Sequence, residues 1–563
     1  MVGQHVAVND ETGDGFCTIV TREIVETALT AFKAIRSAPT SPYDKLIAQG
    51  NGVSEFPGMQ VVGELVTPNS ISTRTALRPS PLYNRWGNCG LLPANSTPFI
   101  GPFGDTIEPL KKMLLPYATA LVYYDPIEVA LAAHDAFRPL TELTFDHVRE
   151  TYTFEEAVAG IPNKFKGIPR GTSLGGQYVL AGESNKRAMF GTEEYTFDSP
   201  LAKVCRENVD LIIENAKDGL RQTHVYIEFP KDELLPESKV VDHGKVRLIS
   251  AAPTDLVIAT RMYFMAFATA VSDTRICNGM AIGMNPYQEW ALLTRKLRSR
   301  GLDCIAGDFS RFDASEQSMI HEAILDYING WYSDGNELVR RVLWSEVVHS
   351  IHLTGPTCSR SFLVQWNKSL PSGHPLTTII NSMYNLILFN MCWNRMAPPG
   401  LKHCFWDHVY LCVMGDDNVQ NVSSGVVSWW NQETITDAMG ELHMTYTDES
   451  KNDTEVPLTR PLSEVTFCKR SFVTENFTAL APLTLNTVLW IPYHVRTKVN
   501  AYDITMTNVE LTLGELAMHA PPVWDEWAPQ ILEAAQEVGY VPKLLPLRSV
   551  YQDFILSYTP SYC

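Results

Sequence analysis

Residues 409–422 read VYLCVMGDDNVQNV: an apolar run, the polar quartet Gly415-Asp416-Asp417-Asn418, and a second apolar run. Asp and Asn beside Gly between two apolar runs are typical of a β-hairpin. The tip of this hairpin carries two carboxylates, and such a concentration of negative charge favours a divalent cation with hard oxygen ligands, Mg²⁺ or Mn²⁺. Taken alone, the quartet is equally compatible with a solvated turn, because short motifs of this kind also arise by chance.

Two further carboxylates lie earlier in the chain, in the segment Gly307-Asp308-Phe309-Ser310-Arg311-Phe312-Asp313. The apolar run 302–308 is typical of a buried strand and ends in Asp308, and Asp313 precedes a predicted helix with apolar residues at helical spacing over 319–331. Asp pairs at this spacing are also common at helix caps. Beside the two-Asp hairpin, however, Asp308 supplies the missing ligand for two metal ions about 4 Å apart, which would activate a 3′-hydroxyl and stabilise departing pyrophosphate.

A third segment lies between these two, and residues 371–381 read PSGHPLTTIIN. A Ser-Gly loop runs into a long apolar helix predicted over 376–393, and Thr377 and Asn381 lie four residues apart on one face of that helix. A hydroxyl and an amide in a row are groups that can read a ribose hydroxyl. When this segment is taken singly, a capped helix with two solvent-facing polar residues explains it better.

The order of the three segments is specific. The pattern D-x4-D, SG-x3-T-x3-N and GDD resembles motifs A, B and C of the palm of viral RNA-dependent RNA polymerases. Within the picorna-like order the chain looks most like the polymerases of insect iflaviruses and dicistroviruses, and residues 278–286, NGMAIGMNP, are similar to the segment before motif A there. The resemblance covers 58–563 and implies an α+β fold shaped as a cupped right hand with fingers, palm and thumb.

The resemblance also implies a division of the chain. Residues 1–57 are expected to be an N-terminal extension, with an amphipathic helix over 18–36 followed by a linker. The fingers are expected at 58–246, with motifs G and F, and again at 278–300. The palm is expected at 247–277 and at 301–472, with motifs A to E and an insertion near 335–368 contributed by the fingers, and the thumb at 473–563.

The same likeness assigns the site residues. Asp308, Asp416 and Asp417 are expected to bind the metals and to be catalytic together with Lys451, which resembles the motif D lysine. The residues expected to bind the nucleotide are Asp313, Ser372, Thr377 and Asn381 at the sugar and the motif F cations Lys231, Lys239 and Arg247. The residues expected to bind RNA are Thr172 and Ser173 of motif G, Lys245, and Lys469 and Arg470 of motif E, the primer grip.

The implied function is an RNA-directed RNA polymerase that replicates a positive-strand viral RNA genome from ribonucleoside triphosphates. It would use Mg²⁺, with Mn²⁺ as a substitute. The implied partners are the RNA template and primer, a small genome-linked protein that primes synthesis from a tyrosine, and the proteins of a replication complex. The implied location is the host cell cytoplasm, at membrane-associated replication sites.

Two other functions are alternatives to this interpretation. A reverse transcriptase shares the palm, but it normally has an aromatic residue before the paired aspartates and a bulky side chain near the sugar. Here Gly415 precedes the pair, and Asp313 can accept a hydrogen bond from a 2′-hydroxyl. A catalytically dead polymerase fold that only binds RNA would be expected to have lost a metal carboxylate, and none is lost here.

The composition of the chain limits the possible fold and function less strictly than the motifs do. The chain has 563 residues, 45% of them hydrophobic, so several substructures with large cores are expected. Its net charge is −18, whereas nucleic-acid binders are usually basic. Only the surface that faces the phosphates must be positive, however, so a basic channel within an acidic shell is expected. The sequence predicts no bilayer span and no signal peptide, and its 11 cysteines are expected to be reduced thiols.

Overall fold

The computed structural model describes residues 58–65, 75–175, 178, 185–357, 360–451, 456–475, 478–496 and 500–557, together with two short strands before them. These strands are β1 (Arg36–Ser37), which pairs with β10 (Leu220–Arg221), and β2 (Ile47–Ala48), which pairs with β3 (Met59–Leu65). The helix predicted over 18–36 lies outside the described residues, except for Arg36, which is in a strand.

The centre of the molecule is a four-stranded antiparallel sheet in the order β17-β18-β14-β19. Its strands are β14 (Asp303–Ser310), β17 (Val409–Met414), β18 (Asp417–Val422) and β19 (Thr445–Asp448). The apolar runs predicted to be strands at 302–308 and 409–414 are therefore strands. The hairpin turn is shorter than predicted, because Met414 already pairs with Asp417, leaving Gly415 and Asp416 as the turn residues. The positive φ of Gly415 (+65°) is the conformation that such a two-residue turn requires of its first residue.

Two long helices pack beside this sheet. They are α13 (Ser318–Tyr332) and α15 (Thr377–Met396), and both were predicted from their apolar spacing. Almost every residue of α15 from Ile379 to Trp393 is buried, which is why its sequence is apolar on all sides.

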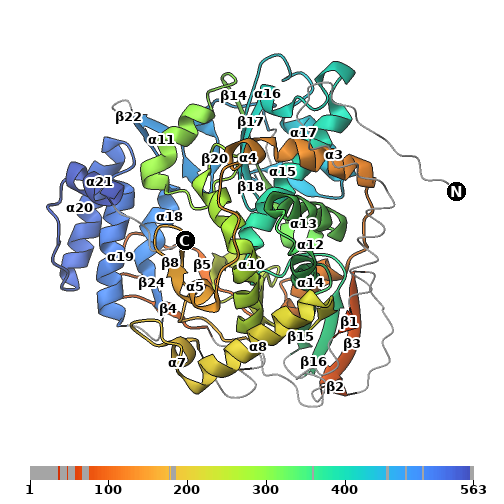
Figure 1. Cartoon of the computed structure of the whole chain (residues 1–563). Helices are drawn as coiled ribbons and strands as arrows, with labels where there is room; N and C mark the ends of the chain where they lie inside the picture. The colour runs from red at the N-terminus through yellow and green to blue at the C-terminus, as the bar shows by residue number, and fades with distance from the viewer. Residues whose placement is uncertain are drawn as a thin grey trace.

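A second sheet of six strands has the order β13-β11-β15-β16-β3-β2. It joins segments far apart in the sequence: β11 (Val225–Pro230), β13 (Leu248–Ala251), β15 (Ile351–Thr357) and β16 (Arg360–Trp366). The strands of the predicted insertion near 335–368 therefore lie in a sheet with strands from 225–251 and 59–65, at the lower right of Figure 1.

Helix α10 (Thr254–Asp273) runs through the interior between the two sheets and the outer helices. It packs against α8 (Pro200–Lys217), α5 (Phe154–Ala159) and α14 (Glu337–Val348). Among the described residues it is the one helix long and apolar enough to cross a bilayer, but 72% of its apolar window is buried inside the protein. Burial in the core accounts for that apolarity.

The C-terminal helices form a separate layer, drawn in blue at the left of Figure 1. They are α18 (Leu485–Trp490), α19 (Ala501–Leu516), α20 (Pro521–Glu537) and α21 (Arg548–Ser557). The sequence predicted a mostly helical end, with a break at Pro521, where α20 begins.

An N-terminal segment reaches across to this helical layer. Strand β4 (Leu77–Pro79) pairs antiparallel with β24 (His494–Arg496), and Leu82 is fully buried among the C-terminal helices. The indole Nε1 of Trp86 donates to the carbonyl of Leu489 at 2.9 Å. The segment 77–86 is therefore joined to the C-terminal helical layer by strand pairing, by burial of Leu82 and by a side-chain hydrogen bond.

Candidate active site

The three metal-binding carboxylates predicted from the sequence lie at one end of the central sheet. Strands β14 and β18 are antiparallel with Gly307 opposite Asn418, so Asp308 follows at the end where Asp416 and Asp417 form the hairpin tip. Helix α15 holds this tip through two side chains: the Asn385 amide donates to the Gly415 carbonyl at 2.9 Å, and the Gly415 N–H donates to the Ser382 hydroxyl at 2.9 Å.

The electrostatics of these carboxylates fit a divalent cation. Burial, and then the charges of Asp417 and Asp308, raise the pKa of Asp416 to about 6. Burial and the charge of Asp308 also raise the pKa of Asp417. Carboxylates held this close in a buried site repel one another, and hard carboxylate oxygens are the ligands that Mg²⁺ and Mn²⁺ prefer. The residues present therefore fit the metals expected from the sequence.

Lys451 lies beside the carboxylates, as its assignment to motif D requires. It follows β19, the neighbour of β14, and its ammonium group forms an ion pair with Asp308. Within the described parts of the chain, no three acidic, His or Cys side chains are grouped as a ready-made metal site. Asp308 is here neutralised by the lysine.

The predicted sugar-reading pair is brought together. The Asn381 amide of α15 donates to Asp313 Oδ1 at 2.7 Å, although the two residues are far apart in the sequence. Burial raises the pKa of Asp313 to about 6, and the hydrogen bond from Asn381 opposes that rise. Asn381 Oδ1 is buried and accepts no hydrogen bond from the residues that the structure describes. A buried acceptor without a donor suits a ligand hydroxyl.

The other two members of the predicted sugar cluster hold the loop before α15. Ser372 Oγ accepts a hydrogen bond at 3.1 Å from the backbone N–H of Ser250, at the edge of the six-stranded sheet. A side chain at Gly373 would collide with the Ser250 carbonyl, so this close approach requires glycine. The Thr377 hydroxyl donates to the carbonyls of Pro371 and His374. Its oxygen can still accept a hydrogen bond, so the role of Thr377 at the sugar stays a prediction.

The motif F cations Arg247 and Lys231 gather around one carboxylate, that of Glu233. Arg247 Nε donates to Glu233 Oε1 at 2.6 Å, and Lys231 lies 3.7 Å from the same carboxylate. The charges of Asp416 and Asp313 add to the effect of Glu233 in raising the pKa of Arg247, which places the guanidinium within electrostatic reach of both. Glu233 was not chosen from the sequence, yet it holds two of the predicted phosphate ligands in place.

Lys245, which the resemblance assigns to RNA binding, lies within electrostatic reach of the same cations. Burial, followed by the charges of Lys239, Lys451 and Arg247, lowers the pKa of Lys245. Its backbone N–H also donates to the Lys239 carbonyl at 2.9 Å. Lys245 thus lies within electrostatic reach of Lys239, Arg247 and Lys451, and four cations in one region favour a polyanionic ligand such as a triphosphate.

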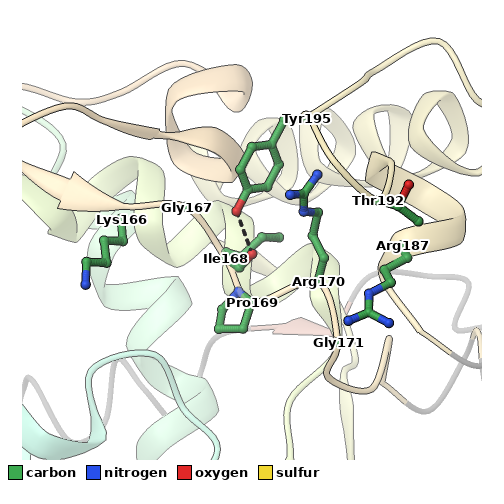
Figure 2. A pocket seen from close by; sticks show the side chains of 9 residues that line it. All are labelled: Lys166, Gly167, Ile168, Pro169, Arg170, Gly171, Arg187, Thr192 and Tyr195. Atoms are coloured by element: carbon green, nitrogen blue, oxygen red, sulfur yellow. Dashed lines mark hydrogen bonds between the residues drawn. The ribbon is translucent and has the colours of Figure 1, made fainter. Parts of the chain in front are cut away.

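The motif G residues lie beside a basic cavity of about 330 Å³. Figure 2 shows Arg170 beside Tyr195, with Lys166 and Arg187 on either side. The loop itself is held by a buried lysine that the sequence did not single out. The Lys186 ammonium donates to the Thr172 hydroxyl at 2.8 Å and to the Ser173 carbonyl. Lys186 therefore orders the loop that carries the two predicted template contacts.

Motif E forms a short hairpin of β20 (Thr466–Phe467) and β21 (Arg470–Ser471). Lys469 lies at the tip of this hairpin. The charge of Lys469 and a hydrogen bond from Cys468 both act to lower the pKa of Asp417, against the larger effect of burial. Arg470 points elsewhere: it is 9% exposed and forms an ion pair with Glu515 at 2.8 Å. The predicted contact between Arg470 and the primer is therefore contradicted, since the guanidinium is buried and already paired.

Comparison with known proteins gives consistent relatives. A family described as "Viral RNA-dependent RNA polymerase" matches residues 103–534. The chain is 36% identical over 413 residues to the replicase polyprotein of Acute bee paralysis virus, covering 70% of this chain and 21% of that protein. It is 29% identical over 602 residues to the replicase polyprotein of Drosophila C virus, covering 100% of this chain and 34% of the relative. The chain thus spans about a fifth to a third of the length of these curated relatives.

The solved structure titled "Sicinivirus 3Dpol RNA dependent RNA polymerase" is similar in fold. It superimposes with a TM-score of 0.71 at 20% sequence identity and covers 87% of this chain and 97% of the other. At this identity the likeness concerns the fold: the α+β right hand of fingers, palm and thumb expected from the sequence.

Proposed function

This chain belongs to the viral RNA-dependent RNA polymerase family, and on that premise we propose that it copies a positive-strand viral RNA genome by two-metal nucleotidyl transfer. One observation carries the proposal: Asp308, Asp416 and Asp417 lie at the same end of the central sheet, within electrostatic reach of Lys451 and Arg247. Phosphoryl transfer needs negative charge that binds metal ions and, close to it, positive charge that binds a triphosphate.

Asp308 and Asp416, assisted by Asp417, would hold the metals, with Mg²⁺ as the natural ion and Mn²⁺ as a substitute. When bound, such ions activate the attacking 3′-hydroxyl and stabilise the departing pyrophosphate. The main role of these side chains is to supply negative charge at a fixed position, which α15 secures through Asn385 and Ser382.

The cations bind and neutralise the triphosphate. The planar fork of Arg247 suits phosphate oxygens, and Glu233 orients it. Lys231, Lys239 and Lys245 add positive charge around it. Lys451 pairs with Asp308 and lies within electrostatic reach of Lys245, and we assign to Lys451 the proton that the departing pyrophosphate takes up.

Asp313 and Asn381 select the ribose. The orphaned Asn381 Oδ1 can accept the proton of a 2′-hydroxyl, and Asp313 can accept a further hydrogen bond. A deoxyribose leaves these buried groups unpaired, which disfavours it. This feature supports ribonucleotide synthesis over the reverse transcriptase alternative.

RNA would pass along the remaining predicted contacts. Lys469, at the tip of the motif E hairpin, would touch the primer backbone close to Asp417. Thr172 and Ser173, held by Lys186, would line the entrance of the template. Both contacts are with the backbone, so they position the strands without reading their sequence.

The relatives suggest the wider context. The bee virus and Drosophila virus relatives are replicase polyproteins, which supports a role in viral replication. We propose a genome-linked protein primer that presents a tyrosine hydroxyl, further replication-complex proteins as partners, and replication sites on membranes in the host cytoplasm.

The test is primer extension with the purified chain, a primed homopolymer RNA, labelled nucleotides and Mg²⁺. We expect incorporation of the complementary ribonucleotide alone, and a parallel reaction with a tyrosine-bearing peptide tests protein priming. Incorporation of deoxynucleotides with equal efficiency would favour a reverse transcriptase. RNA binding without incorporation of either would favour a catalytically dead polymerase fold.

A further inference from the structure

The Arg470 side chain is anchored in the C-terminal helical layer. Its guanidinium donates to both carboxylate oxygens of Glu515 in α19, at 2.8 and 3.0 Å, and to the Ala481 carbonyl at 2.6 Å. The exposed fractions of the two side chains are 11% for Arg470 and 5% for Glu515. A buried bidentate pair of this kind fixes position strongly, because losing either partner leaves a buried charge unpaired.

A third element joins the same junction. Tyr287, near the start of α11 (Pro286–Lys296), donates its hydroxyl to Glu515 Oε1 at 2.6 Å. The Arg470 guanidinium also lies over the Tyr287 ring, 5.1 Å from its centroid. Glu515 therefore ties together the motif E hairpin, the C-terminal helical layer and the helix before motif A.

The hairpin tip fixed by this junction has an unfavourable backbone. Cys468 and Lys469, the two turn residues, have φ values of +51° and +63°. Two-residue turns with both φ values positive suit the twist of a hairpin, but Asn and Gly normally occupy them. Other side chains pay a conformational cost there and keep such a backbone only where their surroundings hold it. The Lys469 carbonyl accepts a hydrogen bond from the backbone N–H of Thr484 at 3.2 Å. Strand β20, which leads into the tip, packs against β18, which begins at Asp417. A hydrogen bond from Cys468 also acts to lower the pKa of Asp417.

From this arrangement we propose that Arg470, Glu515 and Tyr287 are positioning residues that hold the Cys468–Lys469 tip against Asp417. Through them α19 sets where the primer end lies relative to the metal-binding carboxylates. The inference rests on the proposed polymerase function for its kinetic consequence but not for its structural one. It also gives Arg470 a role in place of the primer contact expected from the sequence.

A matched control lies in the same helical layer. Arg548 of α21 forms a bidentate pair with Glu475 at 2.8 and 2.7 Å, with exposed side-chain fractions of 15% and 24%. The variants Glu515→Gln and Glu475→Gln each remove one carboxylate charge from a largely buried Arg–Glu pair. Both lose stability, but only the first releases the hairpin tip.

The first experiment needs no catalysis. Full-length parent, Glu515→Gln and Glu475→Gln are treated with N-ethylmaleimide, and labelling of Cys468 is followed by peptide mass spectrometry. We expect Glu515→Gln to speed labelling of Cys468 about tenfold, because local opening of the tip becomes easier, while Glu475→Gln leaves it near the parent rate. Equal Cys468 rates in all three proteins, with each melting cooperatively, would overturn the proposal.

The second experiment measures extension of a primed RNA. We expect Glu515→Gln to raise the KM for primer–template or lower kcat by about tenfold to a hundredfold, as misplacement of reacting groups does. The effects of Glu515→Gln and Lys469→Ala should be less than additive, since both act on the same contact. Full additivity would refute the proposal. If Glu515→Gln does not fold, Tyr287→Phe replaces it in both experiments, with smaller shifts in the same direction, and parent-like values in both would then refute it.

If the parent itself extends no primer, the polymerase proposal fails, whereas the labelling experiment still decides the positioning role. The two failures are thus separate.

Discussion

Replacing Asn381 by alanine tests the sugar-reading pair with a small change in the buried surface of α15. In the parent, its amide donates to Asp313 at 2.7 Å, and its carbonyl oxygen is a buried acceptor with no donor in the described structure. A ribonucleotide would supply that donor through its 2′-hydroxyl, and a deoxynucleotide would not. The variant removes the acceptor, so both nucleotides then meet the same surface.

The size of the effect follows from the cost of an unpaired buried group. Leaving such an acceptor unsatisfied costs about 1–3 kcal/mol. Because every 1.4 kcal/mol or so corresponds to tenfold, the parent should prefer ribonucleotides through this contact by about five- to a hundredfold. Asn381→Ala should reduce the ratio of kcat/KM values for ribo- and deoxynucleotides by that factor. Loss of the amide donor also raises the pKa of Asp313 further, because the hydrogen bond from Asn381 lowers it in the parent.

The assay is single-nucleotide extension of a primed RNA with matched ribo- and deoxynucleotides. A control is Asn390→Ala, which removes a buried amide from the same helix, where it donates to the Leu386 carbonyl at 2.9 Å. The control should keep the parent ratio even if its overall activity falls. A ribo-to-deoxy ratio in Asn381→Ala equal to that of the parent would refute this account of sugar selection.

Three further predictions follow from the same site and from the N-terminus. Lys451→Arg keeps a cation beside Asp308, but a guanidinium almost never gives up a proton. Nucleotide affinity should therefore stay near normal while nucleotide incorporation slows at least about tenfold. Equal pre-steady-state incorporation rates in parent and variant would show that Lys451 contributes only its charge. Burial raises the pKa of Asp313 to about 6. Between about pH 6 and pH 4, this carboxyl is therefore protonated in the folded protein but still ionised in the unfolded chain. The parent should therefore gain unfolding free energy relative to Asp313→Asn as the pH falls from about 7 to 5 in urea titrations with EDTA, and parallel curves would contradict this. Deletion of 1–57 removes β1 and β2, so it should lower the melting temperature while changing the extension rate per folded molecule only a little. A truncated protein that is folded and monodisperse but inactive would contradict this.

The sequence predicted the central elements because their signals are local. Strand β14 and helix α15 follow apolar patterns within single segments, and the GDD quartet marks a turn by composition alone. The order of the three motifs then placed Asp308 beside Asp416 through resemblance. The proposed division into fingers, palm and thumb residues, by contrast, stays a prediction at the level of its boundaries.

The errors concern contacts that no local pattern encodes. Arg470 resembles an exposed primer-binding cation, but its partner Glu515 lies 45 residues away on a helix whose docking depends on the whole fold. Thr377 is not one of these errors, but the sequence did not reveal that its hydroxyl also donates to two carbonyls of the loop before the helix. Lys186 and Glu233 were missed for the same reason: their roles come from what they hold, and only three-dimensional proximity reveals that.

The central claim, that these carboxylates hold the metals of a nucleotidyl transferase, is tested most directly by Asp416→Asn. Primer extension across a Mg²⁺ titration and the affinity for primed RNA are measured on the same preparation of parent and variant. An amide is neutral and a poorer ligand for a hard cation, so the account predicts that extension is abolished while RNA affinity stays nearly unchanged. Near-normal extension by Asp416→Asn at every Mg²⁺ concentration would contradict it.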